Sequence, residues 1–398
     1  MLVSYRFRNF QSFRDWTEVD WSQNLKVPDS DWLAAGSGDQ RLAKVMAVLG
    51  HNASGKTALL KALVFVHWFI GRSFAEVSPE NPIPVSPHFS SLDEPVEFEV
   101  TFEFEGTLWR YELACTPKRV VREALYKRKE RFSYVFIRET KEGSSYYKVK
   151  QQDFGFSASK LEEICNLRQN ASLIALAAQY GVPLAKDLAS SIFWASNINM
   201  LGRMHMSHEL LFQAAEYFAV QSNLKEKMSR LLCNWDLGLS DVELLEFSST
   251  NPDGLATKKW MPHGVHRVSS KEFSLAMVEE SSGTQAAFVL LAALLPVLEL
   301  GGLAIIDEFE NDLHPHMLEP ILDLFANPAT NPHNAQMLFT CHAVEMLNLL
   351  PKSQVMLVEK DSECESSAWR LDDVEGIRSD DNYYAKYMAG AYGAVPSL

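Results

Sequence analysis

The chain has 398 residues, a length that suits two or three structural units rather than one small domain. Hydrophobic residues make up 47% and charged residues 22%, so a large core is available and global disorder is not expected. With 37 basic and 51 acidic residues, the net charge is −14, which argues against non-specific nucleic-acid binding by the chain as a whole.

The cysteines and the N-terminus indicate the compartment. The five cysteines are widely spaced and include no C-x-x-C pair, which is typical of reduced thiols rather than of a disulfide or zinc framework. The N-terminal stretch "MLVSYRFRNF" has arginines and aromatic residues where a signal peptide needs an apolar run. We therefore expect a cytoplasmic protein without a membrane partner.

Residues 1–155 are expected to form the N-terminal lobe. "LVSYRFRNFQSF" predicts an edge strand and a turn, and "KVMAVLG" predicts a central strand that is covered on both faces. The later stretch "ALLKALVFVHWFI" is apolar all round and predicts a buried helix. Strict alternation in "VEFEVTFEFEG", followed by two hairpin patterns, predicts a β-rich layer at residues 90–150.

Between the central strand and the buried helix lies "GHNASGKT", which matches the phosphate-loop pattern G-x-x-x-x-G-K-[ST]. Glycines let backbone N–H groups turn toward an anion at the positive end of the helix. Lys56 would reach the β and γ phosphates of ATP, and the Thr57 hydroxyl would bind Mg²⁺. A chance glycine turn is the alternative. The predicted nucleotide-binding residues are Gly50, His51, Asn52, Ala53, Ser54, Gly55, Lys56 and Thr57.

The run "KRVVREALYKRKER" concentrates positive charge within an acidic chain. It is either a solvated hairpin face or a contact for nucleic acid or an acidic partner. The basic residues of this run are Lys118, Arg119, Arg122, Lys127, Arg128, Lys129 and Arg131.

Residues 156–240 have a helical pattern, as in "SHELLFQAAEYFAV", and predict a helical insertion. "STNPDG" and "WMPHG" are expected to be loops or hairpin turns. Residues 241–375 are expected to form a C-terminal lobe, and residues 376–398 a tail that docks on the body or on a partner. Helices and strands alternate in the C-terminal lobe, which indicates a parallel sheet. The expected elements are a helix at 284–299, a strand at 303–307, a helix from about His316, a strand at 336–340, a further helix and a strand at 354–359.

The apolar run "VLLAALLPVLELGGLAII" is long enough for a membrane helix. Pro296, Glu299 and the pair Gly301 and Gly302 interrupt it. We therefore expect a buried helix, a turn and a short buried strand instead.

In "LAIIDEFENDLHP" two carboxylates directly follow a predicted buried strand. Asp307 would hold Mg²⁺ through water, and Glu308 would orient and deprotonate an attacking water in phosphoryl transfer. "MLFTCH" ends at His342, which would face the same crevice at the carboxyl end of another strand. The alternatives are a strand that ends in solvent and a structural histidine. The predicted catalytic residues are thus Glu308 and His342, and the predicted metal ligands are Thr57 and Asp307.

"EESSGTQAAF" reads like a second phosphate-contacting loop at the start of a helix. Because Ser282 is a good N-cap residue type, the alternative is a serine-rich helix cap.

Taken together, "GHNASGKT", "ESSGTQ", "LAIIDEFENDLHP", "FTCH" and the terminal "AGAYGAVP" resemble the ABC-type ATPase heads of SMC, RecF and OLD-like proteins. The chain is most similar to a clade of prokaryotic AAA-family ATPases of anti-phage defence, such as RloA, PtuA and AriA. The resemblance implies an α/β P-loop NTPase with an ABC-type ATPase head, in which helices flank a mixed or parallel sheet beside the β-rich layer. It also implies an ATP hydrolase that uses ATP and Mg²⁺.

The resemblance assigns residues as well. Asp307 and Glu308 match the Walker B pair, residues 311–314 match the D-loop region, and His342 matches the switch histidine. The Q-loop glutamine is not placed, because no glutamine lies between Thr57 and Val96. The signature motif is S-G-G-Q in transporters, and its second glycine is replaced by threonine here. In such heads the signature completes the site of a second copy, which implies a homodimer or a higher even oligomer. The matching residues are Ser282, Gly283, Thr284 and Gln285.

OLD-like proteins carry a nuclease domain after the ATPase, and "LVEKDSE" resembles its start. Only 39 residues follow Glu359, which is too few for another catalytic domain, so we expect a separate effector. The leading hypothesis is an ATPase that dimerises around ATP and Mg²⁺ and controls a toxic effector, a nuclease or another toxin, in bacterial anti-phage defence. Two alternatives stay open. One is a DNA-repair ATPase of the RecF or SMC kind, against which the acidic charge and the missing coiled-coil pattern count. The other is a scaffold that ATP only locks.

Overall fold

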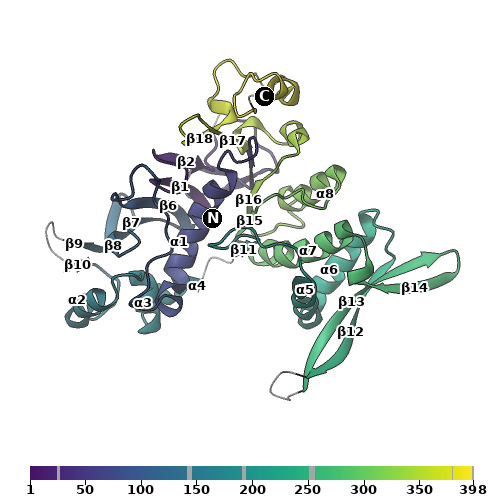
Figure 1. Ribbon diagram of the computed structural model, residues 1–398, viewed down its shortest axis with the longest axis horizontal. Helices are drawn as coiled ribbons and strands as arrows, with labels where there is room; N and C mark the ends of the chain where they lie inside the picture. The colour runs from purple at the N-terminus through teal and green to yellow at the C-terminus, as the bar shows by residue number, and fades with distance from the viewer. Residues whose placement is uncertain (25–26, 141–145, 191–193, 251–255, 379, 397–398) are drawn as a thin grey trace.

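The computed structural model describes residues 1–24, 27–140, 146–190, 194–250, 256–378 and 380–396. A mixed sheet forms the centre of the molecule, with the strand order β11-β15-β16-β5-β17-β18 (Figure 1). The first five strands are parallel, and β18 is antiparallel to β17. The strands are β5 (Val45–Leu49), β11 (Trp194–Ser196), β15 (Leu303–Ile306), β16 (Gln336–Thr340), β17 (Val355–Lys360) and β18 (Ser366–Arg370). This arrangement confirms the predicted α/β fold.

The central strands read as continuous apolar runs because both faces of the sheet are covered. Met46 and Val48 of β5 belong to a core that they share with helix α1 (Lys56–Glu76). The alternate residues Val45, Ala47 and Leu49 belong to a second core, which they share with α7 (Ser282–Leu300) and α8 (Pro315–Ala326). The sheet thus separates two hydrophobic cores, and α1 lies on one side while α7 and α8 lie on the other.

A second sheet is antiparallel, with the order β10-β9-β8-β7-β6-β1-β2, and it closes the core around α1. It contains the β-rich layer predicted for residues 90–150, including the β9–β10 hairpin, whose turn at 141–145 lies outside the described residues. Its strands are β1 (Leu2–Arg8), β2 (Thr17–Asp20), β6 (Val96–Phe104), β7 (Thr107–Cys115), β8 (Val120–Arg128), β9 (Phe132–Thr140) and β10 (Tyr147–Gln151). In sequence order, β2 is followed by a small antiparallel hairpin, which consists of β3 (Leu33–Ala35) and β4 (Arg41–Ala43).

The helices between the two lobes form two groups. α2 (Ala158–Leu167), α3 (Leu173–Gln179) and α4 (Pro183–Ser190) pack into the core of α1, whereas α5 (His208–Val220) and α6 (Ser222–Asn234) pack into the core of α7. The span expected to be a helical insertion, 156–240, therefore also contains β11, which pairs with β15 in the central sheet. The chain crosses from one face of the sheet to the other at this strand.

Residues 241–250 and 256–276 form a three-stranded antiparallel sheet that projects from the body at the right of Figure 1. We call it the β12–β14 arm; it consists of β12 (Asp241–Thr250), β13 (Ala256–Val268) and β14 (Lys271–Ala276). The turn predicted at "STNPDG" lies mostly outside the described residues. The prediction that "WMPHG" is a loop or turn is wrong, because residues 260–264 lie inside β13. Pro262 pairs with Leu244 on β12, but the other side of β13 is open at this position, because the pairing with β14 begins only at His263. A proline, which has no backbone N–H to donate, is tolerated at such an open side of a strand.

The end of the chain also differs from expectation in one element. The helix expected between β16 and β17 is a pair of 3₁₀ segments, Val344–Asn348 and Lys352–Gln354. Pro351 separates them, and a proline disfavours helical backbone in the residue before it. The tail packs on the body, where α9 (Tyr383–Met388) contributes Tyr387 to the second core and its hydroxyl donates to the Ala394 carbonyl at 2.7 Å.

Two helices of the described residues, α1 and α7, are long and apolar enough to cross a membrane by length and composition alone. The expectation for the apolar run at 289–306 was a buried helix, a turn and a strand. In the structure α7 ends at Leu300, Gly301 turns the chain with a φ of 75°, and β15 follows. Both helices line the two cores described above.

A fully buried ion pair joins the antiparallel sheet to the helices beside it. The guanidinium of Arg138 on β9 lies 3.5 Å from the carboxylate of Glu123 on β8, and neither side chain is exposed. Arg138 also donates to the carbonyl of Ala171 at 2.8 Å, and Glu123 accepts from the backbone N–H of Leu173 at 2.8 Å. The pair therefore fixes α3 against the sheet.

We predict that Arg138→Ala lowers the free energy of unfolding by about 3–5 kcal/mol, because it leaves the Glu123 carboxylate buried and unpaired. The matched control is Arg122→Ala, which removes a partly exposed ion pair with Glu112 and should cost no more than about 1 kcal/mol. Denaturant unfolding measures both values. Equal losses in the two variants would contradict the structural role assigned to Arg138.

Candidate active site

The loop between β5 and α1 has the backbone that an anion-binding loop needs. Gly50 and Gly55 have φ values of 156° and 117°, and Ala53 has a φ of 63°. A Cβ at Gly50 would lie 2.1 Å from the Val358 carbonyl oxygen, and one at Gly55 would lie 2.5 Å from the Ser366 hydroxyl. Both glycines are therefore required by close approach, and the loop leads directly into the positive end of α1.

Lys56 begins α1 and folds back over this loop. Its ammonium donates to the carbonyl oxygens of Gly50 at 2.9 Å and His51 at 3.0 Å. Burial lowers the pKa of Lys56, and the neighbouring Asp307 carboxylate opposes that shift. The ammonium thus lies at the mouth of the loop, where it can exchange carbonyl partners for phosphate oxygens.

Asp307 follows β15 and is almost completely buried, with 2% of its surface exposed. Its carboxylate accepts hydrogen bonds from the hydroxyls of Thr57 at 2.9 Å and Thr340 at 2.7 Å. The Thr340 hydroxyl also accepts from the backbone N–H of Glu308 at 2.7 Å. One threonine therefore positions both acidic residues at the end of β15.

The donor set at Asp307 fits Mg²⁺. Mg²⁺ prefers oxygen ligands and is usually held by one or two carboxylates together with water and substrate phosphates. Thr57 and Asp307 supply a hydroxyl and a carboxylate next to the phosphate loop, as predicted. Among the described residues there is no cluster of three or more His, Cys, Asp or Glu side chains that could hold a metal without such a substrate.

Asn197 is a site residue that the sequence did not indicate. It directly follows β11, its side-chain oxygen accepts from the Asp307 N–H at 2.7 Å, and its side-chain nitrogen donates to the Asp307 carbonyl at 2.9 Å. It lies far along the chain from the stretch between Thr57 and Val96, which contains no glutamine. The available signal was a polar residue directly after a short strand, the same signal that identified Asp307 and His342.

Glu308 and His342 reach the same cavity as the phosphate loop. Glu308 has a φ of 50°, a left-handed conformation that costs energy for a non-glycine residue and is common at functional sites. His342 is exposed, and its backbone N–H donates to the Glu310 carboxylate at 2.6 Å. The structure therefore brings the predicted catalytic residues together with the phosphate loop.

The cavity has a volume of about 650 Å³. Segments from both ends of the chain complete it, because the Ser366 hydroxyl on β18 donates to the Ser54 carbonyl at 2.7 Å and lies in hydrogen-bond contact with the Ser12 hydroxyl at 2.8 Å. Sequence reasoning missed these contributors, since only tertiary contacts bring them to the loop. The lining residues are Gln11, Ser12, Asn52, Ala53, Ser54, Gly55, Lys56, Thr57, Ala58, Asp307, Glu308, Thr340, His342 and Lys360.

The predicted signature residues do not line this cavity. Ser281, rather than Ser282, caps α7, because its hydroxyl accepts from the Thr284 N–H at 3.2 Å. The serine-rich helix cap is therefore present, but Ser281 forms it instead of Ser282, which lies exposed in the first turn of α7. A Cβ at Gly283 would lie 2.8 Å from the Asp312 carbonyl oxygen, so the glycine is needed where α7 meets residues 311–314. Gln285 donates to the Glu280 carbonyl at 2.8 Å, which fixes the entry to the helix.

The basic run at 118–131 is divided between two places. Lys118 and Arg119 precede β8, whereas Lys129 and Arg131 follow it, so about 25 Å of strand separates the two groups. Arg122, between them, pairs with Glu112. Nucleic-acid contact through these residues stays a prediction, and each group would have to act separately.

Comparisons with known proteins give one family match. Residues 45–348 match the family described as "AAA domain, putative AbiEii toxin, Type IV TA system". The match runs from β5, before the phosphate loop, to the segment after His342. No curated protein matches the sequence.

Among solved structures, the chain is similar to heads of SMC proteins. An SMC head bound to the C-winged helix domain of ScpA is 12% identical with a TM-score of 0.45, covering 94% of this chain and 99% of that one. The SMC head domain from Thermotoga maritima is 14% identical with a TM-score of 0.42, covering 93% and 98%. An Smc head with an extended coiled coil, bound to the C-terminal domain of ScpA and derived from Pyrococcus furiosus, is 10% identical with a TM-score of 0.45, covering 94% and 97%.

We predict that Thr340→Val weakens the Mg²⁺-dependent part of ATP binding by about 10–100-fold, the usual cost of losing a group that orients a metal ligand. Valine has nearly the shape of threonine but cannot hold the Asp307 carboxylate or the Glu308 N–H. Thr340→Ser keeps the hydroxyl and is the matched control. Titration of ATP with Mg²⁺ and with a chelator separates the metal-dependent part. An equal loss with the chelator would contradict this role for Thr340.

Proposed function

We propose a function for this chain from one premise: it belongs to the AAA-domain family that matches residues 45–348. The chain acts as an ABC-type ATPase that pairs around ATP and Mg²⁺ and thereby controls a separate effector protein. The observation that carries this proposal is the shared cavity of the phosphate loop, Asp307 and Glu308, together with the exposed start of α7 outside it.

The residues divide the work of hydrolysis. The loop N–H groups and Lys56 hold the phosphates, and Thr57 and Asp307 hold Mg²⁺, which neutralises charge on the phosphate oxygens. Glu308 orients the attacking water and accepts its proton, since phosphoryl transfer needs little else from the protein beyond positioning and charge. His342, at the carboxyl end of the neighbouring strand, contacts the γ-phosphate side of the same cavity.

The position of Ser282 supports pairing. In the ABC-type arrangement, two chains face each other so that the start of α7 in one chain meets the phosphate loop of the other. An exposed serine in the first turn of a 19-residue helix suits this role, because a helix N-terminus attracts phosphate. Each site is then built from two chains, and the protein works as a homodimer or a higher even oligomer.

The effector belongs to the same proposal. The description of the matching family names a toxin of a type IV toxin–antitoxin system, which supports a role in toxin control or anti-phage defence. The β12–β14 arm supports a protein partner, because Leu245, Phe247 and Phe273 are exposed on it. We propose that the effector is a toxic protein, a nuclease in the first instance, whose release or activity depends on the nucleotide state. The protein acts in the cytoplasm.

We predict that Glu308→Gln lowers kcat for ATP by about 100-fold or more, because general-base help is worth about 10²–10⁴ in rate. ATP binding remains, so the paired state should accumulate in ATP and Mg²⁺. Phosphate release and analytical ultracentrifugation give the two readouts. Turnover that is unchanged by Glu308→Gln would contradict the assigned chemistry.

We predict that Ser282→Arg abolishes ATP-dependent pairing of the Glu308→Gln protein while each monomer keeps its affinity for ATP. The added side chain and charge obstruct the partner surface without touching the chain's own cavity. Ser281→Ala is the matched control, since it loses only a helix cap, worth about 1 kcal/mol of stability, and should still pair. Pairing that survives Ser282→Arg shows that the start of α7 is not part of the interface.

Control of the effector is tested by expressing the chain with the product of the neighbouring gene. The expected result is a complex that forms in one nucleotide state and is lost in Lys56→Ala. Turnover stimulated by double-stranded DNA, without any such complex, would instead favour a DNA-repair ATPase.

A further inference from the structure

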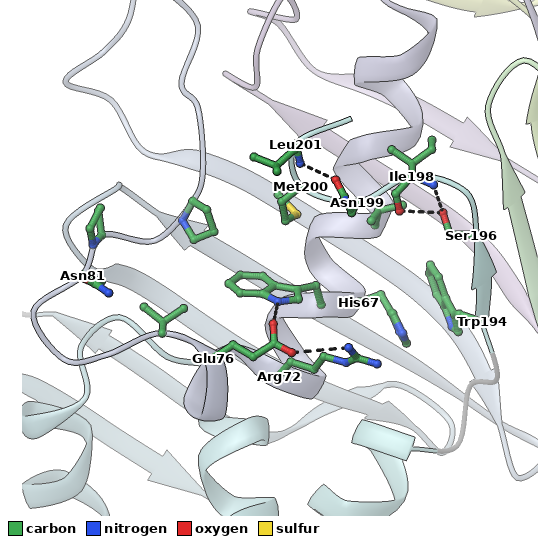
Figure 2. Close-up of a pocket in the computed structure, with 15 residues that line it drawn as sticks. His67, Arg72, Glu76, Asn81, Trp194, Ser196, Ile198, Asn199, Met200 and Leu201 are labelled. Carbon is green, nitrogen blue, oxygen red and sulfur yellow. Dashed lines mark hydrogen bonds and ion pairs between the residues drawn. The ribbon is translucent and has the colours of Figure 1, made fainter. Parts of the chain in front are cut away.

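Residues 197–204, which follow β11, form a tight hairpin that the proposed chemistry does not use. We call this segment the 197–204 hairpin. The Asn199 N–H donates to the Gly202 carbonyl at 2.9 Å, and the Asn199 side chain accepts from the Leu201 N–H at 2.8 Å. Ile198 and Arg203 face each other as an antiparallel bridge. These bonds make the hairpin a defined structure, and Figure 2 shows the bond between Asn199 and Leu201 that closes its turn.

The hairpin is held at its base and borders a cavity on its other side. At its base, Asn197 bonds both backbone groups of Asp307, as described above. On its other side lies a cavity of about 560 Å³ against α1, where the ring of His67 stacks on Trp194 with centroids 4.2 Å apart (Figure 2). Burial lowers the pKa of His67 to about 4, so this ring is neutral at neutral pH. The hairpin is therefore fixed at its base to the acidic end of β15, and the stacking of Trp194 on His67 fixes the preceding strand, β11, to α1.

Arg203 extends from this hairpin to Glu308. Its guanidinium lies 3.0 Å from Oε2 of the Glu308 carboxylate, and the Arg203 and Glu308 side chains are 20% and 38% exposed. Glu308 lines two cavities, the one with the phosphate loop and a smaller one of about 200 Å³ between the hairpin and α7. Arg203 lines the smaller cavity and not the one with the phosphate loop. It therefore contacts Glu308 from the side away from the phosphate loop.

We propose that Arg203 is a positioning residue for hydrolysis: it holds the Glu308 carboxylate toward the attacking water without contacting the nucleotide. This inference rests on the proposed function. A glutamate side chain with more than a third of its surface exposed would otherwise sample several rotamers. An ion pair to one carboxylate oxygen selects one orientation, and it leaves the carboxylate able to face the phosphate loop with its other oxygen.

The test compares steady-state ATP hydrolysis by Arg203→Ala, Arg203→Lys and the unchanged chain. We expect kcat to fall about 10–100-fold in Arg203→Ala, because a small misplacement of a catalytic group costs up to about that much. KM for ATP should change less than about twofold, since the guanidinium lies outside the nucleotide cavity. Arg203→Lys should recover part of kcat because it retains the charge but not the planar guanidinium.

Two controls keep the result specific. Arg72→Ala removes the same charge from α1, across the cavity from the hairpin, where Arg72 forms an ion pair with the exposed Glu76, so kcat should stay unchanged. In the Glu308→Gln background, Arg203→Ala should have no further effect, because the group that it positions is already lost. If Arg203→Ala does not fold, as judged by thermal unfolding, Arg203→Gln, which retains most of the side-chain length, takes its place in the same comparison.

Three outcomes would overturn the inference. A rise in kcat in Arg203→Ala would show that Arg203 restrains Glu308 rather than positioning it. A raised KM with unchanged kcat would show contact with the nucleotide, and a further loss in the Glu308→Gln background would show an action independent of Glu308. If the unchanged chain has no Glu308-dependent turnover, the proposed function itself fails, and the role of Arg203 fails with it.

Discussion

The site depends on one buried carboxylate. Asp307 is 2% exposed, and a buried charge is tolerated only where hydrogen bonds replace the lost water. Thr57 from α1 and Thr340 from β16 supply those bonds to the carboxylate, and the Asn197 side chain, after β11, holds both backbone groups of the same residue. Three elements that are far apart in sequence are thus fixed to the end of β15 by one residue. The hydrogen bonds that Asp307 requires consequently also fix the positions of the catalytic residues around it.

The parallel order of the strands explains why the site opens at one edge of the central sheet. In a parallel sheet the carboxyl ends of all the strands lie along one edge, and loops there converge on a crevice. The phosphate loop and the pair Asp307 and Glu308 directly follow β5 and β15, and His342 lies two residues after the end of the neighbouring strand β16. The start of α7 does not open into the same cavity, which is why we assign it to the site of a second chain.

Sequence patterns predicted those parts of the site that are local. "GHNASGKT" needs its glycines because neighbouring backbone and side-chain atoms lie too close for any larger residue, so the phosphate loop has a local sequence pattern. An apolar strand followed by two acidic residues can likewise be recognised from the local sequence. Asn197, Thr340 and Arg203 were missed because their roles come from strand order: β11 is next to β15, and β15 is next to β16. The β12–β14 arm was missed for a related reason. Pro262 is typical of a turn in the sequence alone, and only the strand pairing shows that it lies where β13 is paired with β12 but not with β14.

The claim that one site is shared by two chains is tested most directly by mixing two inactive variants. Lys56→Ala loses its phosphate loop but keeps the start of α7, whereas Ser282→Arg keeps the loop and loses the start of α7. Neither variant should hydrolyse ATP alone, and the mixture should regain turnover because the mixed pair contains one intact site. A mixture with no more activity than the sum of its two parts would contradict a shared site.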